Sequence, residues 1–357
     1  MSLRLRTAAS AAIAAALFFA APLRSQSASP DSPATPAFRE VMDETGRTVR
    51  IPQPVRRIVS LAPSMTETVY ALGLQDRLVG DTDYCDYPPD AQTKTKVGGG
   101  INPSLEKIVS LHPDLVLVTK AFNLPETVHS LEGLGISSYA TDPHSVDDII
   151  ASTKKLSGLL DASDSGISVG NEMQHHLDDL QRRLASLPAK SVLFVVWTQP
   201  LISIGKGTFI ADALRRAGAV SIVNSSQDWP QVNLEEMARL QPEYLVFADS
   251  HSETVSSQVD TLATLPAWRL LNAVANRRFA VISEAVNRPA PRIVSAIEDL
   301  ARQLHPEAFA DKPSNAKEKI EQQNPSQPTK PSRNLAFASQ SQSPQPPTLA
   351  GGCACAL

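Results

Sequence analysis

Short apolar runs rich in β-branched residues alternate with stretches of helical periodicity along most of the chain. Such runs are typical of buried strands, and the stretches between them place apolar residues three or four positions apart, as amphipathic helices do. The alternation predicts an α/β protein with largely parallel sheets. The strands are expected at residues 58–61, 78–80, 115–118, 137–139, 192–197, 244–248 and 279–282.

The first helix is expected at 64–72, between Pro63 and Gly73. Ser64 and Glu67 have the spacing of a capping box, in which each side chain binds the backbone N–H of the other residue. The sequence therefore predicts that Glu67 caps this helix.

A single long helix is expected between the two groups of strands. Apolar residues recur at helical spacing from Met173 to Leu187, directly before Pro188. We predict two Rossmann-like lobes, 45–160 and 189–305, joined by a connecting helix at 161–188. A cleft between two such lobes is the default site for a ligand.

The two ends differ in character from this body. Residues 1–27 have two arginines before an Ala-rich apolar stretch, the pattern of an export signal, with an uncleaved anchor as the alternative. Residues 28–44 are expected to form a linker. Residues 306–357 are rich in Pro, Ser and Gln and are expected to be disordered.

Composition and charge exclude several classes of protein. The chain has 33 basic and 37 acidic residues among its 357, a net charge of -4, so a nucleic-acid partner is not expected. Three cysteines are too few for a disulfide framework that would stabilise a chain of this length. Cys85 is expected to be a small buried side chain, with metal ligation as the alternative. Cys353 and Cys355 form either an incomplete metal site or part of a solvated tail.

An internal repeat links the two lobes. Residues 104–118 (SLEKIVSLHPDLVLV) match residues 233–247 (NLEEMARLQPEYLVF) at most apolar positions. Each copy predicts a short helix, a proline and a buried strand, so the lobes are expected to share one plan. Glu106 and Glu235 occupy the same place in the two copies. They either complement their helix dipoles or form a matched pair of charges for a partner with two basic pockets.

Motifs for catalysis are lacking. The chain has no P-loop, no dinucleotide-binding glycine pattern, no nucleophile elbow and no HExxH zinc motif. The glycines at 98–100 are expected to give a loop backbone freedom. His175 and His176 are adjacent, would diverge on a helix, and are expected at the surface rather than on a metal.

Aromatic and charged residues gather where the chain leaves its predicted strands. Core packing is the alternative role for each ring, and is the one expected of Trp268. Rings facing a cleft would suit a large, partly apolar ligand, whose polar edges charged residues would fix. The candidate ligand-binding residues on this ground are Tyr84, Asp86, Tyr87, Trp197, Trp229 and Arg288.

The motifs together resemble a known family. The runs RRIVSLAPSMTETVYALGLQDRLVG, DYCDYPPDA and NPSLEKIVSLHPDLVLV, followed by DWPQVNLEEMARLQPEYLVF and RPAPRIVSAIEDLARQL, are similar to periplasmic substrate-binding proteins for iron chelates and cobalamin. The resemblance covers about residues 45–305. It implies a non-enzymatic periplasmic protein, acting as a monomer without a resident cofactor, with little hinge motion between its lobes.

The resemblance also implies partners and contacts. Such proteins deliver a metal chelate to an ABC importer, and Glu106 and Glu235 match the glutamates that dock onto its membrane subunits. DYCDYPP and DWPQV are nearest to the cobalamin-binding branch, where Tyr84 matches a corrin-contacting tyrosine. The segment from Glu284 to Arg288 matches a loop that contacts the ligand, which adds Glu284 to the candidates.

The sequence departs from that branch in the first lobe. Gly100 and Thr119 stand where tryptophans line the cobalamin site, so haem or a ferric siderophore remains the alternative ligand. An enzyme acting in the same cleft and an exported protein tethered by its tail are the alternatives from other classes.

Overall fold

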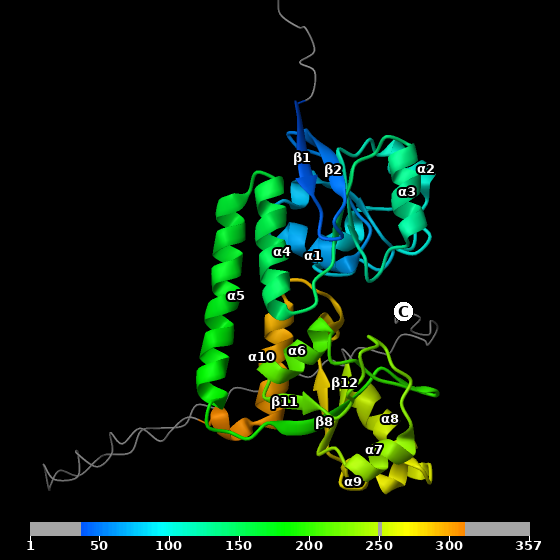
Figure 1. Ribbon diagram of the computed structural model, residues 1–357, viewed down its shortest axis with the longest axis vertical. Coiled ribbons are helices and arrows are strands. Elements are labelled where there is room, and N and C mark those ends of the chain that lie inside the picture. The colour runs from blue at the N-terminus through cyan, green and yellow to red at the C-terminus, as the bar shows by residue number, and fades with distance from the viewer. Residues whose placement is uncertain (1–36, 249–251, 311–357) are drawn as a thin grey trace, which may run out of the picture. The chain divides into compact units, whose positions relative to one another are not determined.

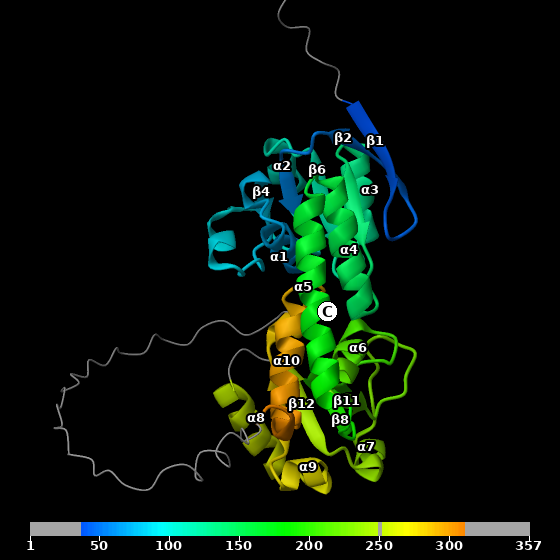
Figure 2. The same ribbon diagram turned by 90° about the vertical axis from the view of Figure 1, so that its left-hand side faces the viewer.

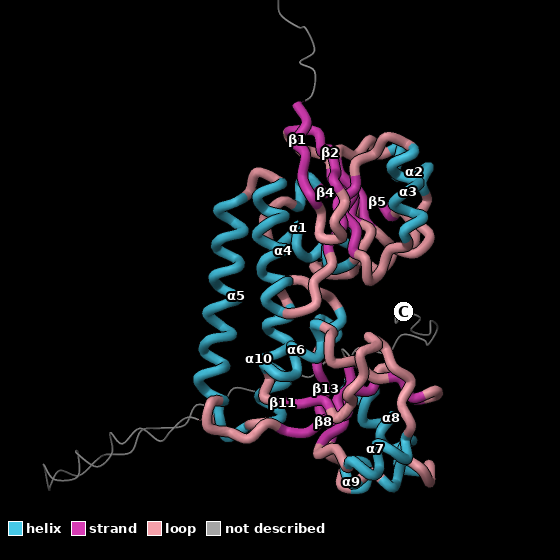
Figure 3. Tube along the Cα trace, in the orientation of Figure 1, coloured by secondary structure: helices cyan, strands magenta, loops and turns pink. Residues whose placement is uncertain are grey.

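The computed structural model describes residues 37–248 and 252–310, which contain two parallel sheets with helices around them (Figures 1 and 3). The predicted signal segment, residues 28–36 of the predicted linker, most of the predicted tail and both C-terminal cysteines lie outside these residues. The α/β class and the parallel arrangement are confirmed.

The first sheet has the strand order β5-β4-β3-β6-β7, with all neighbours parallel. Its strands and helices follow each other along the chain as expected of an α/β unit. They are β3 (Ile58–Ser60), α1 (Pro63–Ala71), β4 (Leu78–Asp81), β5 (Thr95–Lys96), α2 (Leu105–Ser110), β6 (Leu115–Thr119), α3 (Pro125–Gly133), β7 (Ser138–Thr141) and α4 (Val146–Leu159). Strand β6 is buried along its whole length, which explains its unbroken apolar run.

The second sheet has the order β11-β8-β12-β13, also parallel throughout. Its elements are β8 (Lys190–Val195), α6 (Phe209–Arg216), β11 (Ala219–Ser221), α7 (Leu234–Leu240), β12 (Tyr244–Ala248), α8 (Ser252–Thr264), α9 (Asn272–Ala275), β13 (Phe279–Ile282) and α10 (Ile293–Leu304). Strands β12 and β13 have the predicted bounds.

Helix α5 (Ser163–Leu184) lies between the two sheets in the chain, as predicted. Met173, Leu177 and Leu180 are buried on one face. The helix packs against α4 and also against α6 and α10 (Figures 1 and 2). A Cβ at Gly166 would lie 2.4 Å from the Cβ of Ser157, so the contact between α4 and α5 requires glycine there.

Both repeat copies have the predicted structure. Helix α2 is followed by Pro113 and β6, and α7 is followed by Pro242 and β12. The side chain of Ser104 accepts a hydrogen bond from the Lys107 backbone in one copy, and that of Asn233 accepts one from the Glu235 backbone in the other. A shared plan therefore includes a polar N-cap on each short helix.

Three boundaries differ from the predictions. β1 (Ala37–Met42) pairs with β2 (Thr48–Gln53), so a hairpin begins inside the expected linker. Trp197 does not end β8 but lies on β9 (Trp197–Thr198), which pairs with β10 (Leu201–Ile202). The expected tail begins too early, because residues 306–310 continue the fold and Phe309 packs under the guanidinium of Arg302 at 4.5 Å.

The predicted capping box on α1 is wrong. The N-cap residue is Ala62, with no side-chain cap, and Pro63 occupies the first turn. Glu67 is 4% exposed and its carboxylate accepts hydrogen bonds from two arginines far along the chain. The tertiary contact outcompetes the local one because a buried carboxylate requires charged partners.

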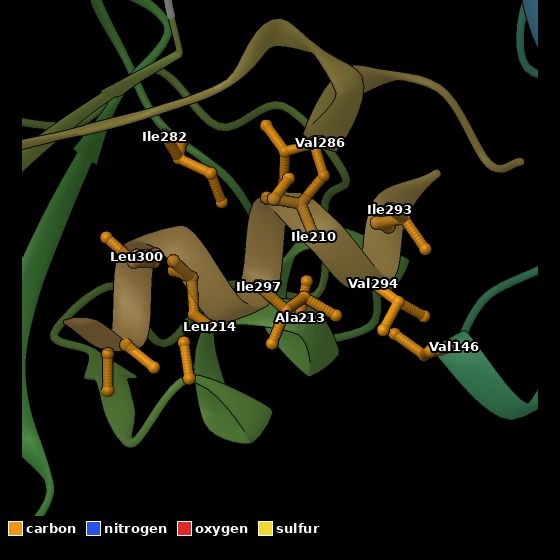
Figure 4. Packing of buried hydrophobic residues seen from close by; sticks show 14 of the residues in the cluster. Val146, Ile210, Ala213, Leu214, Ile282, Val286, Ile293, Val294, Ile297 and Leu300 are labelled. Carbon is orange, nitrogen blue, oxygen red and sulfur yellow. The ribbon is translucent and has the colours of Figure 1, made fainter. Parts of the chain in front are cut away.

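The largest hydrophobic cluster joins elements of both halves of the chain. It includes the start of α4, one face of α5, and much of α6 and α10. Figure 4 shows Val146 of α4 beside Val294 of α10. At the same place the backbone N–H of Val146 donates to Asp212 Oδ2 of α6 at 2.8 Å. Asp212 thus supplies negative charge at the N-terminus of α4, where the helix dipole favours it.

Candidate functional site

The candidate aromatic residues of the first half lie on the segment between β4 and β5. Tyr84 and Tyr87 are 40% and 44% exposed, whereas Cys85 between them is 1% exposed. The Cys85 thiol lies 3.2 Å from the hydroxyls of Thr66 and Thr82, and burial raises its pKa. The expectation that Cys85 is a buried filler is confirmed. The two tyrosines of the same segment, in contrast, lie at the surface.

Lys96 links the segment between β4 and β5 to the sheet through hydrogen bonds. Its ammonium donates to Asp81 Oδ1 at 2.8 Å and to the backbone carbonyls of Cys85 and Ala91 at 3.0 and 3.1 Å. Burial raises the pKa of the Asp81 carboxyl to about 6, against the lowering effect of Lys96. One lysine thereby holds both ends of the loop that carries the tyrosines.

An ion-pair network connects this loop with the segment before α10. Arg288 Nη1 lies 2.9 Å from Glu67 Oε1 and 2.6 Å from Asp86 Oδ1. Arg292 binds the same Glu67 carboxylate with Nε at 2.9 Å and Nη2 at 2.7 Å. Such a two-pronged contact is the strong form of an arginine–carboxylate pair. We call Glu67, Asp86, Glu284, Arg288 and Arg292 the arginine cluster.

Contacts within the cluster favour the charged forms of Asp86 and Arg288. Burial opposes ionisation of Asp86, but the hydrogen bond and charge of Arg288 outweigh it and hold the pKa of that carboxyl below its usual range. Burial likewise opposes the charge of Arg288, and its contacts with Asp86 and Glu67 raise its pKa further. Both arginines are charged in every condition in which the protein is folded.

Tyr87 and Glu284 lie at the edge of the cluster. The Arg292 guanidinium lies 3.9 Å from the centre of the Tyr87 ring, a cation–π distance. Glu284 begins the short 3₁₀ helix η4 (Glu284–Asn287), and its Oε1 is 3.9 Å from Arg288 Nη2. The buried residues that follow it, Ala285 and Val286, anchor this turn in the core.

Tyr84 contacts a residue that the sequence did not single out. Its ring meets that of Phe122 edge-on, with centroids 6.2 Å apart. The Phe122 ring occupies the space above Gly100, where a Cβ would lie 2.0 Å from Phe122 Cε1. Asn123 fixes this region by donating to the carbonyls of Leu61 and Gly100 at 2.9 Å each. Phe122 thus supplies a ring where the first half was expected to lack one.

The segments that carry the predicted tryptophans lie on either side of β10 in the second half. Trp197 and Trp229 are 51% and 43% exposed. Ile202 pairs with Trp197 on one side and forms a bridge with Gln231 on the other, so the two tryptophan segments flank β10. Trp268 is 4% exposed and belongs to a core cluster, as expected.

The structure therefore brings together Asp86, Tyr87, Glu284 and Arg288 of the predicted set. Within the described residues, no hydrogen bond, ion pair or ring contact joins Trp197 or Trp229 to the tyrosines. Glu67, Arg292 and Phe122 were missed as parts of the site. RPAPR does place two arginines four positions apart, which was a usable signal for Arg292, whereas Glu67 was assigned to a local cap.

Glu106 and Glu235 lie at corresponding places on α2 and α7. Both side chains are exposed, and within 37–248 and 252–310 neither carboxylate has an ion-pair or hydrogen-bond partner. Each carboxylate complements the dipole of its own helix. Because an exposed charge of this kind contributes little to the stability of the fold, both carboxylates are available to a partner.

The described part of the chain has no group of three or more His, Cys, Asp or Glu side chains placed to hold a metal ion. His175 and His176 are exposed on α5, and His176 Nδ1 lies 2.8 Å from Glu298 Oε1. No helix among the described residues has the length and apolarity to cross a membrane.

The chain belongs to the periplasmic binding protein family, whose model matches residues 58–286. Over 259 residues it is 30% identical to the vitamin B12-binding protein of Vibrio cholerae, covering 71% of this chain and 90% of that protein.

Solved structures agree with this assignment. The crystal structure of the periplasmic vitamin B12 binding protein of Vibrio cholerae is similar with a TM-score of 0.60 and 28% identity, covering 72% of this chain and 99% of that one. A periplasmic haem-binding protein in complex with two haems is similar with a TM-score of 0.63 and 26% identity, covering 71% of this chain and 99% of that one. These relatives are binding proteins rather than enzymes, and their fold has two lobes.

Proposed function

We propose that the protein captures a cobalamin-like corrinoid in the periplasm and delivers it to an ABC importer. The observation that carries the proposal is the joining of the loop with Tyr84 and Tyr87 to Arg288 in a chain 30% identical to a vitamin B12-binding protein. Exposed rings offer apolar faces to a macrocycle, and the charged groups beside them can bind its polar edge. Trp197 and Trp229 are proposed to contribute from the second lobe.

Calorimetric titration of the purified protein with cyanocobalamin tests the ligand. We expect saturable binding with one site per chain. Replacing Tyr84 by Ala should weaken it about tenfold or more, since a buried aromatic contact contributes about 1–3 kcal/mol. Phe38→Ala, which removes an exposed ring outside the site, should leave the affinity unchanged. Saturable binding of haemin or a ferric siderophore, with none of cyanocobalamin, would refute the corrinoid assignment.

Haem is the second candidate ligand because a haem-binding protein has a comparable TM-score. The corrinoid is preferred because the sequence matches the vitamin B12-binding protein over 90% of that protein's length.

Glu106 and Glu235 are proposed to dock onto basic pockets of the importer's membrane subunits, with the protein acting as a monomer. Two exposed, unpaired carboxylates at repeat-related positions support this role. Replacing both by Gln should abolish corrinoid uptake in cells while leaving the affinity for the ligand intact. Glu236→Gln, which changes an exposed neighbour on α7, is the matched control. Normal uptake by the double variant would refute the docking role.

A further inference from the structure

The arginine cluster presents negative rather than positive charge to its surroundings. The Arg288 and Arg292 side chains are 14% and 22% exposed, whereas those of Asp86 and Glu284 are 50% and 43% exposed. Three carboxylates face two guanidiniums, so the cluster has a net charge of about -1. A bound molecule meets the carboxylates first.

Both arginines already bind carboxylates of the chain itself. Glu67 is engaged by Nε and Nη2 of Arg292 and by Nη1 of Arg288. A ligand carboxylate that took over these donors would leave Glu67, whose side chain is 3% exposed, as a buried charge without a partner. Displacing Asp86 instead would bring two carboxylates against each other. The remaining guanidinium N–H groups can donate without displacing any charge. A ligand carboxylate bound there would be repelled by the exposed carboxylates of Asp86 and Glu284, whereas a neutral carbonyl would not.

We propose that the arginine cluster selects chelates whose edge carries neutral carboxamides and rejects those that present free carboxylates there. This inference rests on the proposed function, namely that a chelate binds against the loop of Tyr84 and Tyr87. A primary amide matches the cluster, because its carbonyl accepts from Arg288 and its NH₂ group donates to Asp86 or Glu284. Corrinoids carry such amides, whereas haem carries two propionates.

The test compares two ligands that differ in one group. Cyanocobalamin and its monocarboxylates, in which one propionamide is hydrolysed to propionate, are titrated into the full chain at low salt. We expect the monocarboxylate whose acid meets the cluster to bind about tenfold more weakly, and the difference to shrink at high salt. Equal or tighter binding of every monocarboxylate would overturn the inference.

Variants test whether the arginine cluster causes the difference in affinity between the amide and the carboxylate. Asp86→Asn with Glu284→Gln should bring the affinities of the two forms together by weakening the amide and strengthening the carboxylate. Asp83→Asn removes an exposed carboxylate of the same loop outside the cluster and should leave the ratio unchanged. An equal change in this control would assign selectivity to overall charge and overturn the inference. Circular dichroism and thermal unfolding establish that each variant is folded.

A second ligand pair separates the two proposals. If neither corrinoid form binds, the proposed function fails, and haemin is then compared with its diamide. Tighter binding of the diamide would support amide selection on a different chelate. Tighter binding of haemin, equal binding of both forms, or no binding of either pair would overturn it.

Discussion

Gly100 illustrates how much a single residue can decide without a side chain of its own. The sequence indicated that the glycines at 98–100 free the backbone, and Gly98 does have a positive φ of 97°. Gly100 has another reason, because the ring of Phe122 and the carbonyl of Leu61 lie where a Cβ would stand. The residue that fills this space is distant in the chain, so no local pattern could have shown it.

Gly100→Ala should therefore disturb both the fold and the site. Its Cβ would lie 2.9 Å from the Leu61 carbonyl oxygen as well as against the ring, and we expect a loss of about 1–3 kcal/mol. Displacement of Phe122 should also weaken ligand binding through Tyr84. Chemical denaturation and titration check both. Gly133→Ala, where nothing lies within 4 Å, should be close to neutral; equal losses in the two variants would contradict the packing argument.

Asp81 should give the stability an unusual pH dependence. The pKa of its carboxyl is about 6 in the folded state, against an ordinary value of 3.8 for aspartate, so between these pH values the folded state holds the proton more tightly. The contribution of Asp81 to the free energy of unfolding therefore falls as pH rises through this window. Asp81→Asn should remove that fall. Urea denaturation at several pH values between about 4 and 7 measures it, and an unchanged slope would contradict the shift.

At the scale of elements, the pattern of apolar residues located the long connecting helix and the strands β3, β4, β6, β7, β8, β12 and β13, because each of these buries one face or both. The hairpin of β1 and β2 was missed, as were the short strands β5, β9, β10 and β11. Every residue of β1 except Val41 is exposed, so this strand has little of the apolar alternation that identifies a strand. Its place beside β2 depends on backbone pairing and on the packing of Val41, Val49 and Ile51 against a core cluster.

The repeat was predictable because its helices and strands are buried on one face or both. The contribution of its N-caps to stability can be tested. Asn233 Oδ1 accepts from the Glu235 backbone N–H at 2.7 Å. Asn233→Ala should lower the free energy of unfolding by about 1 kcal/mol, since one donor of α7 then lacks a partner. Asn233→Asp keeps the acceptor and should retain the stability. Thermal unfolding distinguishes the two, and identical midpoints would show that the cap contributes nothing.

At the scale of the molecule, two kinds of contact link the halves of the chain. The hydrophobic cluster joins α4 and α5 to α6 and α10, and Arg288 and Arg292 reach Glu67 on α1. Because a buried ion pair and a shared core must both be disrupted for the lobes to part, the structure favours the limited hinge motion implied by the family resemblance.

Glu67→Ala should consequently destabilise the molecule strongly. It leaves two half-buried arginines with too few partners, and we expect a loss of about 3 kcal/mol. Arg292→Met should be costly too, and the double variant should lose less than the sum, since the residues act as one unit. Glu40→Ala breaks an exposed ion pair with Arg50 and should cost under about 1 kcal/mol. Additive losses in the cycle would contradict direct coupling.

The sequence by itself determined the α/β class, the long connecting helix, the repeat and the positions of Glu106 and Glu235. These depend on periodicity and on contacts close in the chain, which the order of residues records directly. The tertiary structure decided the partner of Glu67, the place of Phe122 above Gly100 and the commitment of both arginines to carboxylates. Such contacts join residues far apart in the chain, and the stronger, buried interaction overrides the local one that the sequence pattern favours.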